Sequence, residues 1–194
     1  DYGLPVLMLA TCYFAIELEL FRYFNFIQWE MRNEHRSPSD LHGFAFIIQL
    51  LYTIVFVNIV AAINLQWIRN SLLAAFSLGA TALLLFIVLI QGLGILNELA
   101  TFYQQESDKL YYGSLNIGIR YITLGIIAWS LWSARLIIHK LLPQPVLQRA
   151  WLLSVHTVVL AFISAEYLCW TGIGDTGHQY KLGLSIIWGI YALL

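Results

Sequence analysis

Five ionisable side chains interrupt otherwise apolar stretches of this sequence, and their chemistry needs an explanation. They are Glu19, Glu98, Arg120, His156 and Glu166. An unpaired charge in hydrocarbon costs from ~2.5 to more than 10 kcal/mol, so such groups bind ions or solutes, or pair with one another. Several carboxylates with one arginine suit the binding of a small solute or ion inside a membrane. These five residues are therefore our candidate binding residues.

Arg120 is the most informative of the five, because a guanidinium keeps its proton throughout the physiological pH range. It needs either water or an acidic partner, and the sequence places Glu19, Glu98 and Glu166 at a similar depth. One interpretation is a structural ion pair that ties two helical hairpins together. The other is an anion site for a phosphate or carboxylate headgroup. The two interpretations differ in whether the guanidinium faces water.

The glutamates and His156 each allow a binding and a structural interpretation. The carboxylates could form a cluster for cations or protons near one face, or each could reach the headgroups or bond to a neighbouring helix. His156 could relay protons. It could equally form a hydrogen bond between helices, as polar side chains in membrane bundles do. The sequence leaves these alternatives open.

Other kinds of chemistry find no support in the sequence. It contains no Walker-type phosphate loop, dinucleotide fingerprint, HExxH helix or nucleophile elbow, so we expect no catalytic residue. Neither a metal nor a cofactor is expected, because the histidines and the two cysteines show no ligand spacing. A net charge of −1 provides no basic field for nucleic acid. We interpret the loop acids as a solvated rim: Glu30, Glu34, Asp40, Glu106, Asp108 and Asp175.

The composition indicates which solvent surrounds the elements that carry these residues. Of the 194 residues, 60% are hydrophobic and 11% are charged. A soluble domain has roughly 45–50% apolar and about 25% charged residues. A water-soluble fold of this size could not hide so much apolar surface. The sequence therefore predicts an integral membrane protein with the lipid bilayer as its main partner.

The apolar residues gather in long blocks separated by short polar loops. A helix needs about 20 such residues to cross ~30 Å of hydrocarbon. Uninterrupted blocks of this length favour helices over the alternating strands of a membrane β-barrel. We therefore predict an all-α, polytopic transmembrane bundle of about six spans. Their approximate ranges are 3–26, 44–65, 71–98, 112–134, 150–170 and 180–194.

The spans pair into helical hairpins at about 3–65, 71–134 and 150–194, which together form a single transmembrane region over 1–194. The odd-numbered spans share a glutamate followed four residues later by an aromatic residue, which predicts a repeat. The chain starts without Met and stops inside an apolar run, so we expect a fragment of a longer protein. The repeated pairs are Glu19 with Tyr23, Glu98 with Phe102, and Glu166 with Trp170.

These stacked hairpins and the ending YKLGLSIIWGIYALL resemble a family of long, uncharacterised bacterial polytopic membrane proteins. That family is a domain of unknown function built of many transmembrane helices. The resemblance implies a longer native chain in the bacterial inner membrane, with further helices of the same chain or other membrane subunits as partners. It implies no reaction, ligand or catalytic residue.

Basic residues without accompanying acids occupy the loops 66–70 and 135–149, so we predict that these loops are cytoplasmic. For function we favour transport or binding of a small solute or ion at an intramembrane Glu/Arg site. The alternative is a structural or assembly subunit of a bacterial envelope complex. A membrane enzyme acting on a lipid-linked substrate ranks third. A water-filled cavity around Arg120 would favour transport, and a dry ion pair would favour a scaffold.

Overall fold

A computed structural model describes residues 3–33, 40–105, 110–171 and 179–193 of the chain. These residues fold into helices and contain no strand, which confirms the all-α prediction. The helical segments are α1 Gly3–Asn33, α2 Leu41–Ile63, η1 Asn64–Ile68, α3 Ser71–Ile87, η2 Val88–Gly92, α4 Leu93–Gln105, α5 Leu115–Lys140, α6 Pro145–Thr171 and α7 Gln179–Ala192, where η1 and η2 are π-helical turns.

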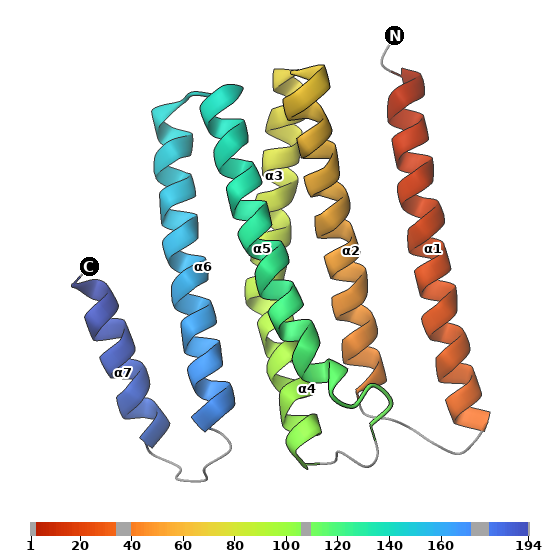
Figure 1. The fold of residues 1–194 in the computed structure, drawn as a ribbon, viewed down its shortest axis with the longest axis vertical. Helices are drawn as coiled ribbons and strands as arrows, with labels where there is room; N and C mark the ends of the chain where they lie inside the picture. The colour runs from red at the N-terminus through yellow and green to blue at the C-terminus, as the bar shows by residue number, and fades with distance from the viewer. Residues whose placement is uncertain (1–2, 34–39, 106–109, 172–178, 194) are drawn as a thin grey trace.

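The helices run alternately up and down the long axis of the bundle (Figure 1). The segments α3, η2 and α4 follow one another as a single rod, so the chain crosses the bundle once between Ser71 and Gln105. Helix α5 lies at the centre and packs against α2, α3, α4 and α6. Helix α1 packs against α2, and α7 packs against α6. A side chain on α5 can therefore meet partners from several helices.

Four helical segments are long and apolar enough to cross a membrane, and the chain is an integral membrane protein. About six spans were predicted, and the described residues form six helical rods, of which α1 and α7 are not among these four. In α1, Glu17, Glu19 and Arg22 place three charges within two turns, and α7 is a short apolar helix. The four segments are Leu41–Ile68, Ser71–Gln104, Leu115–Lys140 and Pro145–Thr171.

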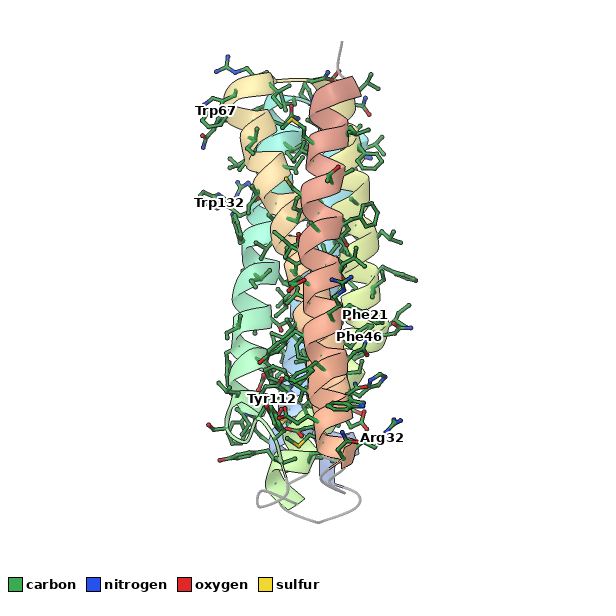
Figure 2. The ribbon with its side chains drawn as sticks, turned by 90° about the vertical axis from the view of Figure 1, so that its right-hand side faces the viewer. Phe21, Arg32, Phe46, Trp67, Tyr112 and Trp132 are labelled. Atoms are coloured by element: carbon green, nitrogen blue, oxygen red, sulfur yellow. The ribbon has the colours of Figure 1, made fainter. Side chains whose placement is uncertain are left out.

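Large aromatic side chains cover the outer surface of the bundle, as expected of a surface that meets lipid. Trp132 and Phe21 are more than half exposed. Figure 2 shows Trp67 near one end of the bundle and Arg32 and Tyr112 near the other. The exposed Trp67 and Arg32, at opposite ends, suit the two interfaces of a bilayer, where amphipathic side chains are enriched.

The turn between α2 and α3 is held by two asparagines. The side chain of Asn64 donates to the backbone oxygen of Asn70 and accepts from its N–H, both at 3.0 Å. Asn70 also caps α3 by accepting from the N–H of Leu72 at 2.8 Å. Between them Arg69 has a φ of 52°, a left-handed conformation that costs a non-glycine residue energy. The hydrogen bonds of the asparagines offset this cost and close the hairpin.

The interior contains apolar clusters at each end and in the middle, but the buried face of α5 carries polar residues as well. Asn116, Arg120, Thr123 and Ser130 are all buried. The hydroxyl groups of Thr123 and Ser130 donate to backbone oxygens of α5 itself. Asn58 of α2 donates to the Ser130 hydroxyl at 2.7 Å. Hydroxyls can be satisfied by their own helix, whereas Asn116 and Arg120 need partners from elsewhere.

Candidate functional site

Arg120 lies between three helices near one end of the bundle, with 3% of its side chain exposed. Its Nε donates to Oε1 of Glu166 on α6 at 2.5 Å. Its Nη1 donates to Oδ1 of Asn97 on α4 at 2.8 Å. The guanidinium of one α5 residue therefore bonds to both flanking helices. We call Arg120, Glu166 and Asn97 the arginine cluster.

The second carboxylate oxygen of Glu166 is also occupied. It accepts from the indole Nε1 of Trp170, one turn later on α6, at 3.0 Å. Charge-assisted bonds to both oxygens stabilise the ionised carboxylate. In the described part of the chain, the Nη2 of Arg120 is buried without a partner. The cluster thus neutralises its own charge and leaves the N–H donors of Nη2 unused.

The other two candidate glutamates do not reach Arg120. Glu98 is exposed, because it is next to Asn97 on α4 and a step of one residue turns a side chain about 100° around a helix. Glu19 is exposed on α1, which packs against α2 rather than α5. The glutamates of the repeated sequence pattern therefore have different surroundings, and the repeat stays a prediction.

His156 lies apart from the arginine cluster, exposed on α6. Its Nδ1 is 2.6 Å from the hydroxyl of Tyr191 on α7. That hydroxyl also donates to the backbone oxygen of His156 at 3.1 Å. These two hydrogen bonds join α6 to α7. They correspond to the structural interpretation of His156, a hydrogen bond between helices.

Asp40 was interpreted as part of a solvated rim, and the structure corrects this interpretation. Its side chain is fully buried, with an exposed fraction of 0%. The carboxylate accepts from the backbone N–H groups of Tyr111 and Tyr112 at 3.1 and 3.0 Å, and from Asn116 Nδ2 at 2.8 Å. We call Asp40, its two backbone donors and Asn116 the aspartate cluster. Of the other predicted rim acids, Glu34, Glu106, Asp108 and Asp175 lie outside the described residues.

The loop before α5 supplies the two backbone N–H groups that bond to Asp40. Gly113 has a φ of +52°, a conformation that glycine adopts at little cost and that turns the chain into α5. The ring of Tyr112 stacks on Phe44 of α2, with a distance of 3.9 Å between ring centroids. Burial raises the pKa of Tyr112 to about 12. A signal for Asp40 existed in the sequence, since aspartate directly before an apolar helix is a common N-cap. Here, however, its side chain bonds to a distant loop instead of its own helix.

A third carboxylate lies in a cleft that sequence reasoning did not single out. The cleft has a volume of about 510 Å³ and lies between α1, α2 and the rod formed by α3 and η2. Glu17 of α1 lines it, and its Oε2 is buried without a hydrogen-bond partner in the described structure. Two glutamines, Gln49 and Gln91, also line the cleft. The nearby Glu19 does not.

No group of three or more His, Cys, Asp or Glu side chains within the described ranges is arranged to hold a metal ion. Comparisons of the chain with protein-family models, curated proteins and solved structures found no match. The resemblance to a family of long bacterial membrane proteins therefore stays a prediction. The chemistry of the site has to be argued from its own geometry.

Proposed function

We propose that this chain is a structural or assembly subunit of a bacterial envelope complex, with the arginine cluster as an internal tie between helices. The observation that carries the proposal is the position of Arg120. It is 3% exposed and bonds to Glu166 on α6 and Asn97 on α4. A guanidinium committed in this way holds helices together.

The physical role of such a tie is to select one arrangement of apolar helices. Leucine-rich faces pack against each other in many registers, because lipid supplies no hydrophobic force that distinguishes between them. A buried ion pair is satisfied in only one register, since any shift leaves a charge unpaired at a cost of several kcal/mol. The pair thus contributes to specificity more than to stability. A defined arrangement is what a scaffold must present to its neighbours.

Transport or binding of a small solute or ion at the Glu/Arg site is the second candidate. It is favoured by the buried Nη2 of Arg120, which has no partner among the described residues. A carboxylate or phosphate oxygen could accept a hydrogen bond from Nη2. Such a ligand would also have to compete with Glu166 for the guanidinium.

The two candidates are separated by replacing the charged pair with apolar side chains of similar length. We expect Arg120→Met alone to destabilise the protein and to disrupt its native complex on a detergent gel. The double variant Arg120→Met/Glu166→Met should recover both, because no charge is left unpaired. For a transport or binding site, the double variant would be stable and assembled but unable to take up or bind solute.

A control pair tests whether any methionine substitution has this effect. Arg135 and Glu98 are both exposed. The variant Arg135→Met/Glu98→Met should assemble like the wild type. A stable R120M/E166M protein that fails to assemble would contradict the structural role, because the charge itself would then be needed for more than packing.

A further inference from the structure

The cleft beside Glu17 is a separate feature from the arginine cluster, because it is lined by residues of α1, α2, α3 and η2. Its volume of about 510 Å³ lies in the range of about 300–1,000 Å³ that is typical of small-molecule sites. A bare ion or a single water, which takes about 30 Å³, would leave most of it empty. Size therefore points to an organic occupant.

Polar groups in this cleft lack partners. The Oε2 of Glu17 is buried and unbonded, and no hydrogen bond to the side-chain amides of Gln49 and Gln91 is found among the described residues. Thr53, by contrast, donates to the backbone oxygen of Gln49 and lies 3.0 Å from the hydroxyl of Tyr13. Unsatisfied polar groups away from water cost roughly 1–3 kcal/mol each. Glu17 Oε2 is the buried group among these three, whereas Gln49 is partly exposed and Gln91 is exposed. The buried carboxylate oxygen therefore needs a donor, and the two amides offer further acceptors to a ligand in the cleft.

The wall of the cleft contains a backbone irregularity. Ile90 and Gln91 lie in the π-helical turn η2, Val88–Gly92, in the middle of the long rod. A π-helical turn inserts an extra residue into a helix and weakens its regular hydrogen bonding, and such turns occur frequently at functional sites. Gln91, which lies in this turn, lines the cleft with an amide side chain among mostly apolar neighbours.

The remaining walls are apolar and one side faces the lipid. Phe86 and Ile90 are each about 60% exposed, so the cleft is reached from the outer surface of the bundle. In Figure 2, Phe46 of α2 is seen beside α1, at the level of Phe21. The other apolar lining residues are Leu50, Leu84 and Ile87. An occupant that enters from the hydrocarbon would meet these side chains first.

We propose that this cleft binds a hydrophobic primary amine in its protonated form. The carboxylate of Glu17 would accept from the ammonium group, and the side-chain oxygens of Gln49 and Gln91 would accept its remaining N–H groups. The apolar body of the amine would lie against Phe46 and Phe86. An ammonium has three donors, which matches the three acceptor side chains.

The charges in the cleft select against other ligands. Ten of the described residues line the cleft and none of these is Lys, Arg or His, so an anion would meet the Glu17 carboxylate without compensation. A neutral alcohol would leave the carboxylate unpaired in hydrocarbon, which is the costly state that an ammonium removes. The inference is independent of the proposed scaffold role, because no residue of the arginine cluster lines this cleft.

The test measures binding of ¹⁴C-labelled n-octylammonium to the purified full chain in detergent by equilibrium dialysis at neutral pH. We expect saturable binding by the wild type and at least tenfold weaker binding by Glu17→Gln. The matched control is Glu19→Gln, which removes an exposed carboxylate two residues away on the same helix and should bind like the wild type. All three proteins sit in the same micelles, so partition of the amine into detergent cancels.

Gln91→Leu is a second variant in case Glu17→Gln does not fold, and we expect it to weaken binding about fivefold. Unlabelled n-octanol should not displace the amine, and sodium should not displace it at equal concentration. Equal binding by the wild type and both cleft variants would overturn the proposal. Displacement by octanol would also overturn it, because the cleft would then be only a hydrophobic groove.

The bound ammonium group could belong to a free amine or to the headgroup of a lipid. Chains reconstituted in bilayers containing phosphatidylethanolamine or only phosphatidylcholine distinguish these sources. Competition with the labelled amine only in phosphatidylethanolamine identifies the lipid as the occupant, and equal binding in both bilayers identifies a free amine. Either result supports a Glu17-dependent ammonium site, provided that Glu17→Gln abolishes it.

Discussion

Two carboxylates, Asp40 and Glu166, are compensated in different ways although their partners on α5 are one turn apart. Asp40 accepts from two backbone N–H groups and from Asn116, all neutral donors. Glu166 accepts from the Arg120 guanidinium and from the indole of Trp170. The aspartate cluster is a charge solvated by dipoles, whereas the arginine cluster is an ion pair.

The difference follows from the position along α5. Before a helix begins, backbone N–H groups are not used by the i to i−4 pattern and can turn toward an anion. Tyr111 and Tyr112 are in this position. At Arg120 the N–H groups of α5 already bond within the helix, so a charge from another helix can be met only by a side chain. The position along α5 therefore decides whether a carboxylate is compensated by backbone N–H groups or by a side chain.

The largest loss of stability is expected when the ion pair is broken by replacing its acidic residue, Glu166. Glu166→Gln keeps an acceptor near Arg120 but leaves the buried guanidinium charge unpaired. We expect a loss of about 3 kcal/mol of unfolding free energy, the low end for a buried pair, because Glu166 is 26% exposed. Unfolding in mixed micelles with increasing SDS measures it. Glu98→Gln, an exposed glutamate of α4, should change stability little, and equal losses in both variants would argue against the ion pair.

The second largest loss of stability is expected in the aspartate cluster. Asp40→Asn replaces one of two acceptor oxygens with an NH₂ group that faces N–H donors. We expect a loss of about 2 kcal/mol, in the range for unsatisfied buried donors. Hydrogen exchange should rise at the amides of Tyr111 and Tyr112 while α6 stays protected. Glu30→Gln is the control, since Glu30 is exposed. Unchanged exchange at the two amides would remove Asp40 from its assigned role.

A smaller loss of stability is expected when residue 120 keeps its positive charge but loses the planar guanidinium geometry. Arg120→Lys keeps the charge but cannot hold Glu166 and Asn97 with two arms of one planar group. We expect a loss of about 1.5 kcal/mol, comparable to one hydrogen bond to a charged group. The same SDS titration measures it. If Arg120→Lys were as damaging as Glu166→Gln, the planar fork rather than the charge would hold the three helices.

The smallest effect concerns Tyr112, whose buried hydroxyl has no partner in the described structure. Tyr112→Phe removes this hydroxyl, so we expect a gain of up to about 1 kcal/mol at neutral pH. Burial raises the native pKa of Tyr112 to about 12, above the value of about 10 in an unfolded chain. The folded form thus keeps its proton longer, and its stability declines as the pH rises from about 10 through 12. The variant should lack this part of the alkaline decline.

Thermal unfolding in detergent between pH 8 and 12 measures the effect of Tyr112→Phe. The control is Tyr111→Phe, because the neighbouring Tyr111 is exposed. It should keep the alkaline decline of the wild type. The same decline in Tyr112→Phe would place the titrating group elsewhere.

Part of the candidate site could be inferred from the residues alone. Arg120 cannot lose its proton, and its need for an acidic partner followed from this property together with its apolar surroundings. The choice among Glu19, Glu98 and Glu166 did not follow, because all three match Arg120 in depth. Asn97 occupies the α4 position that faces Arg120, and one residue further Glu98 faces outward. Asp40 was misjudged because its partners lie about seventy positions away in the chain.

The sequence by itself determined the helical, membrane-embedded character of this protein. Long apolar blocks require lipid as solvent, and lipid requires each backbone polar group to bond within its own helix. That requirement is local, so it can be read from neighbouring residues. Only the tertiary structure decided which charges meet, how Asp40 is compensated and where the Glu17 cleft lies. These depend on the rotation of each helix about its axis, which pairwise packing of similar apolar faces leaves undetermined until all the helices are in place.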